Sequence, residues 1–106
     1  MKRKVFEDIR LACDELEVFL KDKTRDDLEN DRGLQLIVER EFEIIGEAMN
    51  RLLRADPETF AKITHGPRII GTRNILAHGY DSVDYRILWD AFQCDIPKLL
   101  EELKEL

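Results

Sequence analysis

The chain has 106 residues, 43% of them hydrophobic and 38% charged, and a formal net charge of −6. This length suits a single domain over residues 1–106, and the mixture of apolar and charged residues excludes a disordered chain. No apolar run approaches the ~20 residues that cross a bilayer, and the acidic balance argues against indiscriminate nucleic-acid binding, so we expect a cytoplasmic protein without membrane contact.

Two long amphipathic helices are predicted in the first half of the chain. Apolar residues recur at three- and four-residue spacing over about residues 2–22, and again from Leu34 over about five turns. The polar stretch 21–33 between them is typical of a connection, partly helical, with Thr24 available as an N-cap and Gly33 as a break or bend. We expect the two long helices to pack antiparallel.

Two shorter helices are predicted next. Asp56 before Pro57 is a good N-cap, which indicates a short helix over residues 57–63. The segment 67–78 begins with a proline and precedes Gly79, a pattern that brackets a helix of about three turns. The second of these helices ends in the group of side chains that raises the question of function.

The last predicted helix follows a cap at Asp81 or Ser82, and Pro97 inside it should bend it because proline removes a backbone donor. Its inward face would use Val83, Ile87, Leu88, Ala91, Phe92, Ile96, Leu99, Leu100 and Leu103. No alternating run competes as a strand. The sequence therefore predicts an all-α, up-and-down bundle of four to five helices.

Two sets of potential ligands have plain structural interpretations. Cys13 and Cys94 lie in apolar helical patterns without ligand spacing, so we interpret both as buried thiols. The carboxylates Glu39, Glu43 and Glu47 have helical spacing, but no histidine accompanies them, which favours a solvated or interface face over a metal site. We therefore predict no metal and no cofactor.

One segment differs in charge from the rest of this acidic chain. Residues 59–80 contain no aspartate or glutamate, and they include Lys62 and Arg68, two possible contacts for an RNA backbone. The segment closes with RNILAHGY, residues 73–80, which holds an arginine, an asparagine, a histidine and a tyrosine. An acid-free, cationic segment is a candidate binding site for an anion.

The geometry of a helix separates the two most reactive side chains of this motif. Asn74 and His78 are one turn apart and share a face, whereas Arg73 lies about 140° from His78 around the axis. Arg73 and His78 therefore do not converge within one straight helix, and either a frayed last turn or a second copy of the chain is needed to bring such groups together. A two-fold dimer that joins two copies of this helix end would place two histidines and two arginines at one cleft.

These side chains fit the chemistry of ribonucleotide cleavage. That reaction needs a base for the 2′-hydroxyl proton, an acid for the 5′-oxygen and a cation for the phosphoryl oxygens. A histidine titrates in the range suited to the first two roles, and the planar fork of an arginine suits the third. The alternative is structural: Arg73 and His78 would be surface residues at a helix end, and Tyr80 a half-buried packing ring.

The pattern of Arg73, Asn74, His78 and Tyr80 resembles the signature of the HEPN superfamily, and more narrowly the HepT-like toxins of prokaryotic toxin–antitoxin pairs. The stretches EIIGEAMNRL and PRIIGTRNILAHGYDSVDYRILWD agree as well, so the resemblance covers most of the chain. It implies an HEPN-like homodimer with its two motifs facing each other at the interface. The implied activity is metal-independent cleavage of tRNA or mRNA.

The resemblance also implies a role for each residue of the motif. Arg73 and His78 would be the catalytic pair, and Asn74 would orient the histidine or bind phosphate. Tyr80 matches the tyrosine that the partner antitoxin, a minimal nucleotidyltransferase (MNT), modifies with AMP from ATP. The sequence departs from many relatives in having Arg68 directly after Pro67 and no tryptophan there.

Two rival interpretations belong to other classes of protein. In the first, the chain is a non-catalytic HEPN module that presents a nucleotide or small substrate to a nucleotidyltransferase partner. In the second, it is a helical dimerisation scaffold. The intact pair of Arg73 and His78 favours the nuclease over both.

Overall fold

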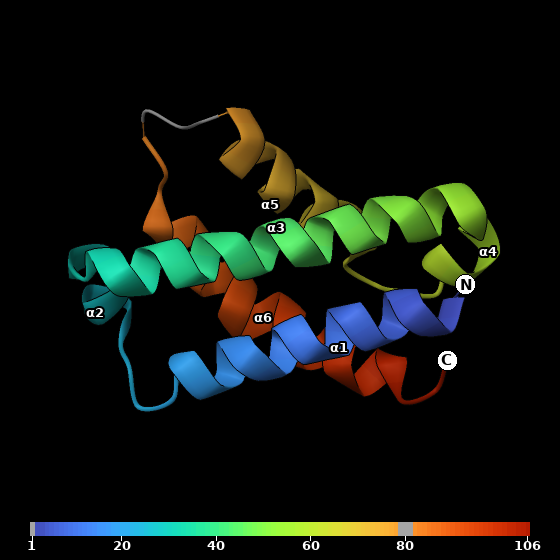
Figure 1. Ribbon diagram of the computed structural model, residues 1–106, viewed down its shortest axis with the longest axis horizontal. Coiled ribbons are helices and arrows are strands. Elements are labelled where there is room, and N and C mark those ends of the chain that lie inside the picture. The colour runs from blue at the N-terminus through green and yellow to red at the C-terminus, as the bar shows by residue number, and fades with distance from the viewer. Residues whose placement is uncertain (1, 79–81) are drawn as a thin grey trace.

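The computed structural model describes residues 2–78 and 82–106, with side chains at 3–77 and 82–106. Within these residues it has no strand and six helices (Figure 1): α1 (Lys2–Phe19), α2 (Arg25–Asn30), α3 (Arg32–Ala55), α4 (Pro57–Phe60), α5 (Gly66–His78) and α6 (Tyr85–Leu103). The predicted all-α class is confirmed. The helix count exceeds the prediction by one because the polar connection between the two long helices forms the short helix α2. None of the described helices is both long enough and apolar enough to span a membrane.

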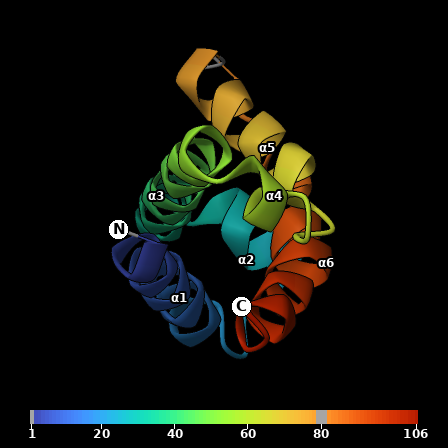
Figure 2. The ribbon, with the colours of Figure 1, turned by 90° about the vertical axis from the view of Figure 1, so that its right-hand side faces the viewer.

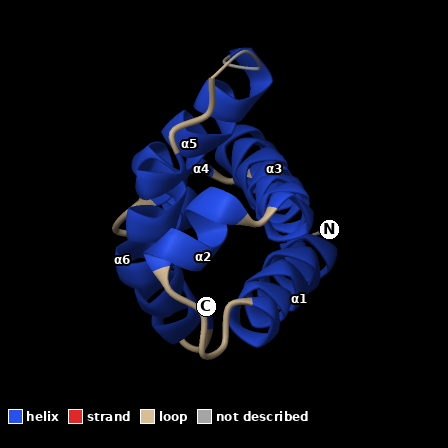
Figure 3. Cartoon of the chain, turned by 90° about the vertical axis from the view of Figure 1, so that its left-hand side faces the viewer, coloured by secondary structure: helices blue, strands red, loops and turns tan. Residues whose placement is uncertain are grey.

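The long helices form a bundle in which α3 is central. Helices α1 and α3 lie side by side and antiparallel, as predicted, and α5 packs on the other side of α3 (Figures 1 and 2). In the view of Figure 1, helix α6 lies behind α1 and α3. Helix α2 crosses one end of the bundle (Figure 3). The N-terminal end of α1 and the C-terminal end of α6 meet at the opposite end.

The core forms where the apolar faces of these helices meet. Its largest fully buried side chains include Leu16 of α1, Leu28 of α2, Phe42 and Met49 of α3, Ile69 of α5, and Leu88 and Leu99 of α6. Spacings of three, four and seven residues place such side chains on one side of each helix, so the hydrophobic periodicity alone accounts for most of the core.

Polar side chains at the helix starts explain several boundaries. Thr24 and Asp27 form the reciprocal capping box of α2, and Asp56 caps α4, so both predicted caps are confirmed. The predicted break at Gly33 is wrong. Asp31 caps α3 by accepting a hydrogen bond from the backbone N–H of Leu34 at 3.1 Å, so Gly33 lies inside the first helical turn.

Two boundaries in the second half differ from the prediction. Helix α4 ends at Phe60, three residues early, and the motif helix starts at Gly66, one residue early. A Cβ at Gly66 would lie 2.8 Å from the ring of Phe60, so a larger residue there would require that ring or the start of α5 to shift. The cap of α6 is Asp84, later than the predicted Ser82, and Asp81 lies outside the described residues.

The interior of α6 also departs from expectation. Cys13 is buried as predicted, but Cys94 is exposed and Ile87 is 40% exposed, so both of those predictions are wrong. An acid takes an inward position instead, since Asp95 is 1% exposed. The helix continues through Pro97 without interruption, and the predicted bend there stays a prediction.

A pair of carboxyl groups in the seam between α1 and α3 makes the stability depend on pH. Glu41 is 6% exposed. Burial and, next, a hydrogen bond with Glu15 raise the pKa of Glu41 from 4.5 to about 7. The unfolded chain releases this proton near its ordinary pKa while the folded chain retains it. The stabilising effect is therefore complete below about pH 4.5 and is lost as the pH rises through about 7.

Replacing Glu41 by glutamine, which stays neutral, is expected to stabilise the protein more at pH 8 than at pH 5, by about 1 to 3 kcal/mol. Denaturant unfolding of both proteins at the two pH values measures the difference. Glu43→Gln is the matched control, because Glu43 is exposed and paired with Arg40 on the same helix. If the free energies of unfolding of Glu41→Gln and wild type differed by the same amount at both pH values, the raised pKa of Glu41 would be contradicted.

Candidate active site

The first six residues of the motif, 73–78, lie on α5, which three inward side chains hold against the bundle. Ile69, Thr72 and Leu76 are buried at three- and four-residue spacing, and the hydroxyl of Thr72 donates to the carbonyl of Arg68 at 3.1 Å. The opposite face is open, since Asn74 is exposed and Ile75 is 42% exposed. Helix α5 is therefore packed on the bundle by one face and presents exposed side chains on its outer face.

Gly46 on α3 allows α3 and α5 to approach each other closely at Arg73. A Cβ at Gly46 would lie 2.2 Å from the Cβ of Arg73 and 2.6 Å from its Cγ. Since such contacts are far inside van der Waals distance, only glycine allows the stem of Arg73 to lie directly on the α3 backbone. Gly46 did not stand out in the sequence, although it lies in the stretch EIIGEAMNRL that carries the resemblance.

The guanidinium of Arg73 pairs with the next residue of α3. Its Nη2 lies 3.5 Å from Oε2 of Glu47, and the two side chains are 32% and 48% exposed. Arg73 is thus partly buried along its stem and open to solvent at its tip. This pairing identifies Glu47 as a neighbour of the motif, a role that its helical spacing alone did not reveal.

The carboxylates at helical spacing on α3 have separate partners. Glu43 pairs with Arg40, and Glu39 accepts hydrogen bonds from Tyr85 and Arg32. Together with the pairing of Glu47, these contacts leave the three carboxylates without a common centre. Across residues 2–78 and 82–106, no cluster of three or more His, Cys, Asp or Glu side chains is arranged to hold a metal ion.

The remaining residues of the motif are placed only in part. His78 is the last residue of α5, and its side chain lies outside the described residues, as does the whole of Tyr80. Because both residues belong to one α-helix, the position of His78 is about 140° from that of Arg73, on the outer face with Asn74. One copy of the chain therefore directs Arg73 toward α3 and leaves the side chain of Asn74 exposed on the outer face of α5.

Arg68, a predicted backbone contact, also has a partner inside the protein. Its Nε donates to Oδ1 and Oδ2 of Asp95 at 3.0 and 3.2 Å. This hydrogen bonding to Asp95 raises the pKa of Arg68 above its ordinary value. Because the carboxylate is buried, Arg68 compensates its charge and ties α5 to α6. The side chain of Arg68 is still 58% exposed, so some of its donors face solvent.

A second set of contacts fixes the start of α6 against α3. The hydroxyl of Tyr85 donates to Glu39, and Nη1 of Arg32 donates to the same hydroxyl at 3.1 Å. Burial and the hydrogen bond with Glu39 raise the pKa of Tyr85, so it stays protonated and able to donate. The connection between the motif helix and α6 is therefore anchored where α6 begins.

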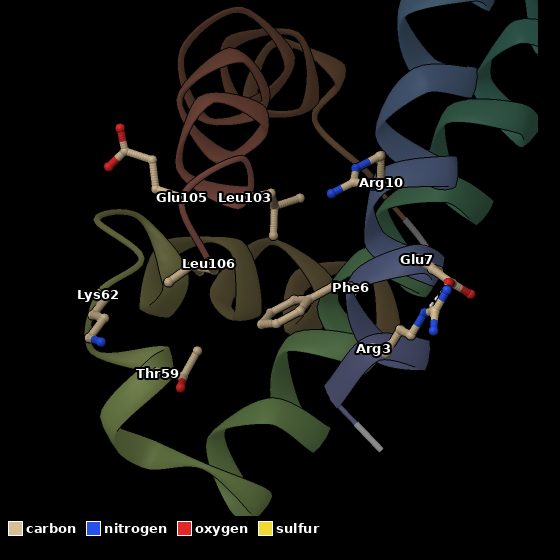
Figure 4. Close-up of a pocket in the computed structure, with 9 residues that line it drawn as sticks. All are labelled: Arg3, Phe6, Glu7, Arg10, Thr59, Lys62, Leu103, Glu105 and Leu106. Carbon is tan, nitrogen blue, oxygen red and sulfur yellow. Dashed lines mark hydrogen bonds and ion pairs between the residues drawn. The ribbon is translucent and has the colours of Figure 1, made fainter.

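Lys62, the other predicted backbone contact, lines a different concave region. A cleft of about 660 Å³ lies at the end of the bundle where the start of α1 and the C-terminal end of the chain come together, and its apolar part is formed by Phe6, Leu103 and Leu106 (Figure 4). Lys62 and Arg10 stand on opposite sides of this cleft. Arg73 is not among its lining residues.

Comparison with known proteins identifies the family. Residues 9–106 match the model of the family described as "Ribonuclease HepT-like". The chain is 32% identical to a Methanocaldococcus jannaschii protein provisionally named RNase MJ1380, over 92% of this chain and 88% of the relative. It is 34% identical to the provisionally named RNase TTE0752 of Caldanaerobacter subterraneus, over 98% and 92%. It is 33% identical to the provisionally named ribonuclease HepT of Thermococcus cleftensis, over 94% and 90%.

The chain therefore belongs to the HepT-like ribonuclease family, and the resemblance that the motif indicated is confirmed. The family match, together with the helical fold, defines the class of protein as an all-α ribonuclease of the HepT type. No solved structure matches the chain significantly.

Proposed function

We propose that this protein is the toxin of a toxin–antitoxin pair, a cytoplasmic endoribonuclease that acts as a homodimer with Arg73 and His78 at the dimer interface. The observation that carries the proposal is the seating of Arg73 on α3 with its tip open to solvent, within a chain of the HepT-like ribonuclease family. The substrate is an RNA, with tRNA and mRNA as the candidate classes.

The proposed reaction is a transesterification that needs no metal or cofactor. One histidine takes the proton of a 2′-hydroxyl, whose oxygen attacks the adjacent phosphorus while the bond to the 5′-oxygen breaks. The second histidine of the dimer protonates that leaving oxygen, and Arg73 stabilises the charge on the phosphoryl oxygens. Asn74 orients the histidine or binds phosphate. The products are a 2′,3′-cyclic phosphate end and a 5′-hydroxyl end.

The outer face of α5 supports the proposed dimer. Asn74 is exposed and Ile75 is 42% exposed, and both lie beside the His78 position. An exposed isoleucine next to a polar motif suits a surface that a second copy covers, because covering it removes apolar area from water. A two-fold axis at this face would bring the two motifs together.

Cleavage by the purified protein tests the proposal. A chain whose intact mass shows no modification is incubated with total RNA in the presence of EDTA, and we expect fragments with 2′,3′-cyclic phosphate ends. Intact RNA under these conditions would overturn the nuclease assignment. Nucleotide affinity without RNA products would instead identify a non-catalytic HEPN module that serves a nucleotidyltransferase.

We propose further that an MNT-type nucleotidyltransferase antitoxin silences the toxin by transferring AMP from ATP to Tyr80. The added phosphate charge would lie two residues from His78 and would exclude RNA. Coexpression with the transferase is expected to raise the intact mass by whole AMP units and to abolish cleavage. Tyr80→Phe should keep its mass and its activity under the same conditions, and a modified Tyr80→Phe protein would refute this site.

A further inference from the structure

We propose that Glu47 is a positioning residue that holds the guanidinium of Arg73 in the orientation needed to bind the scissile phosphate. This inference rests on the proposed function and extends it by one residue from a different helix. Neither the motif nor its spacing points to Glu47, because the residue lies 26 positions before Arg73 in the sequence.

Two contacts restrain Arg73 at opposite ends of its side chain. At the root, Cβ and Cγ lie so close to the α3 backbone at Gly46 that a Cβ there would be 2.2 and 2.6 Å away. At the tip, Nη2 lies 3.5 Å from Oε2 of Glu47. An arginine that is held at both ends loses most of its rotational freedom before substrate arrives, which is the condition for a preorganised site.

The pairing leaves Arg73 free to bind an anion. A guanidinium has five N–H donors, and the side chain of Arg73 remains 32% exposed, so donors not directed at Glu47 face solvent. The neighbouring carboxylates of α3 are engaged elsewhere, Glu43 with Arg40 and Glu39 with Tyr85 and Arg32. Among the described residues of α3, Glu47 is thus the acid that pairs with the motif.

A carboxylate in this place has two opposing effects on RNA. It orients the fork of Arg73, which raises the rate of the chemical step, and its negative charge repels the phosphate that the fork binds. Removal of the charge should therefore lower kcat and lower KM together. A residue that only stabilised the fold would reduce the active fraction, which lowers the apparent kcat and leaves KM unchanged.

Kinetics of three variants test this role. We expect Glu47→Ala to lower kcat about tenfold through loss of orientation. The same variant should lower KM about two- to fivefold, in keeping with the small strength of an exposed ion pair. Glu47→Gln keeps an acceptor oxygen, so its kcat should lie between those of Glu47→Ala and wild type. Because it also lacks the charge, its KM should be as low as that of Glu47→Ala. Glu43→Gln, one turn earlier on α3, is the control and should match wild type.

Binding of a 2′-O-methyl RNA, which lacks the attacking hydroxyl, separates this inference from the proposed function. Fluorescence anisotropy should show tighter binding by Glu47→Gln and Glu47→Ala than by wild type, with Glu43→Gln unchanged. If wild type does not cleave RNA, the proposed function fails and the binding result alone decides the role of Glu47. Unchanged affinity and unchanged kcat, or a fall in apparent kcat at constant KM, would overturn the inference.

Discussion

Arg73→Ala and His78→Ala are each expected to lower the rate of RNA cleavage by at least about 100-fold. Loss of a general acid or base typically costs 10² to 10⁴ in rate, and loss of a group that stabilises transition-state charge costs a similar factor. Arg73 is partly exposed and His78 ends its helix, so we expect both variants to fold. Initial rates on a fixed RNA, with the fold checked by circular dichroism, measure the effect.

Arg40→Ala is the control for the loss of an arginine, because Arg40 forms an exposed pair on α3 and belongs to no proposed site. It should retain wild-type rates. The requirement for two copies is tested separately by Ile75→Asp, which keeps Arg73 and His78 but places a charge on the outer face of α5. Sedimentation should show a monomer with cleavage reduced as strongly as in the motif variants. A fully active monomer would place the whole reaction within one chain.

Gly46→Ala is expected to destabilise the fold by about 2 to 3 kcal/mol, although alanine is the better helix former by up to about 1 kcal/mol. The new methyl group would meet Cβ and Cγ of Arg73, atoms near the backbone that move only if α5 moves. Denaturant unfolding measures the loss. Cleavage should fall as well, because the displacement carries Arg73 away from Glu47.

Gly71→Ala provides the matched control for this substitution. Gly71 lies in the middle of α5, and nothing lies within 4 Å of a Cβ built there. Because the new methyl group meets no other atom, the higher helix propensity of alanine should determine the effect. We expect the free energy of unfolding to rise by about 0.5 to 1 kcal/mol. Equal effects of alanine at the two glycines would show that close packing does not constrain Gly46.

Properties set by nearby residues could be predicted from the sequence. The helical class, the antiparallel pairing of α1 with α3 and the caps at Thr24 and Asp56 depend on periodicity and on side chains a few residues away. The motif was found because its residues lie close together in the chain. The resemblance of the motif to a known family then indicated the candidate roles of its residues, which the hydrophobic periodicity of the sequence does not reveal.

Properties set by contacts between helices could not be predicted in this way. Asp95 occupies an inward position of α6 because Arg68 of α5 supplies the opposite charge. Cys94 and Ile87, which were predicted to be buried, are exposed instead. The pairing of Glu47 with Arg73 depends on how α5 lies against α3. Gly46, a glycine in the interior of α3, marks the close packing in the sequence, but periodicity alone does not identify its partner on α5.

The anchored start of α6 limits how far the proposed adduct on Tyr80 could lie from the motif helix. Tyr80 lies two residues after the end of α5 and five before Tyr85, whose hydroxyl is bound to Glu39 on α3. If Tyr80 is modified as proposed, the attached nucleotide would be a tethered competitor, whose effective concentration depends on how few residues separate it from the site. Excess RNA would displace such a group poorly, and dilution would not release it. Recovery of activity would then require an enzyme that removes the adduct or synthesis of new toxin.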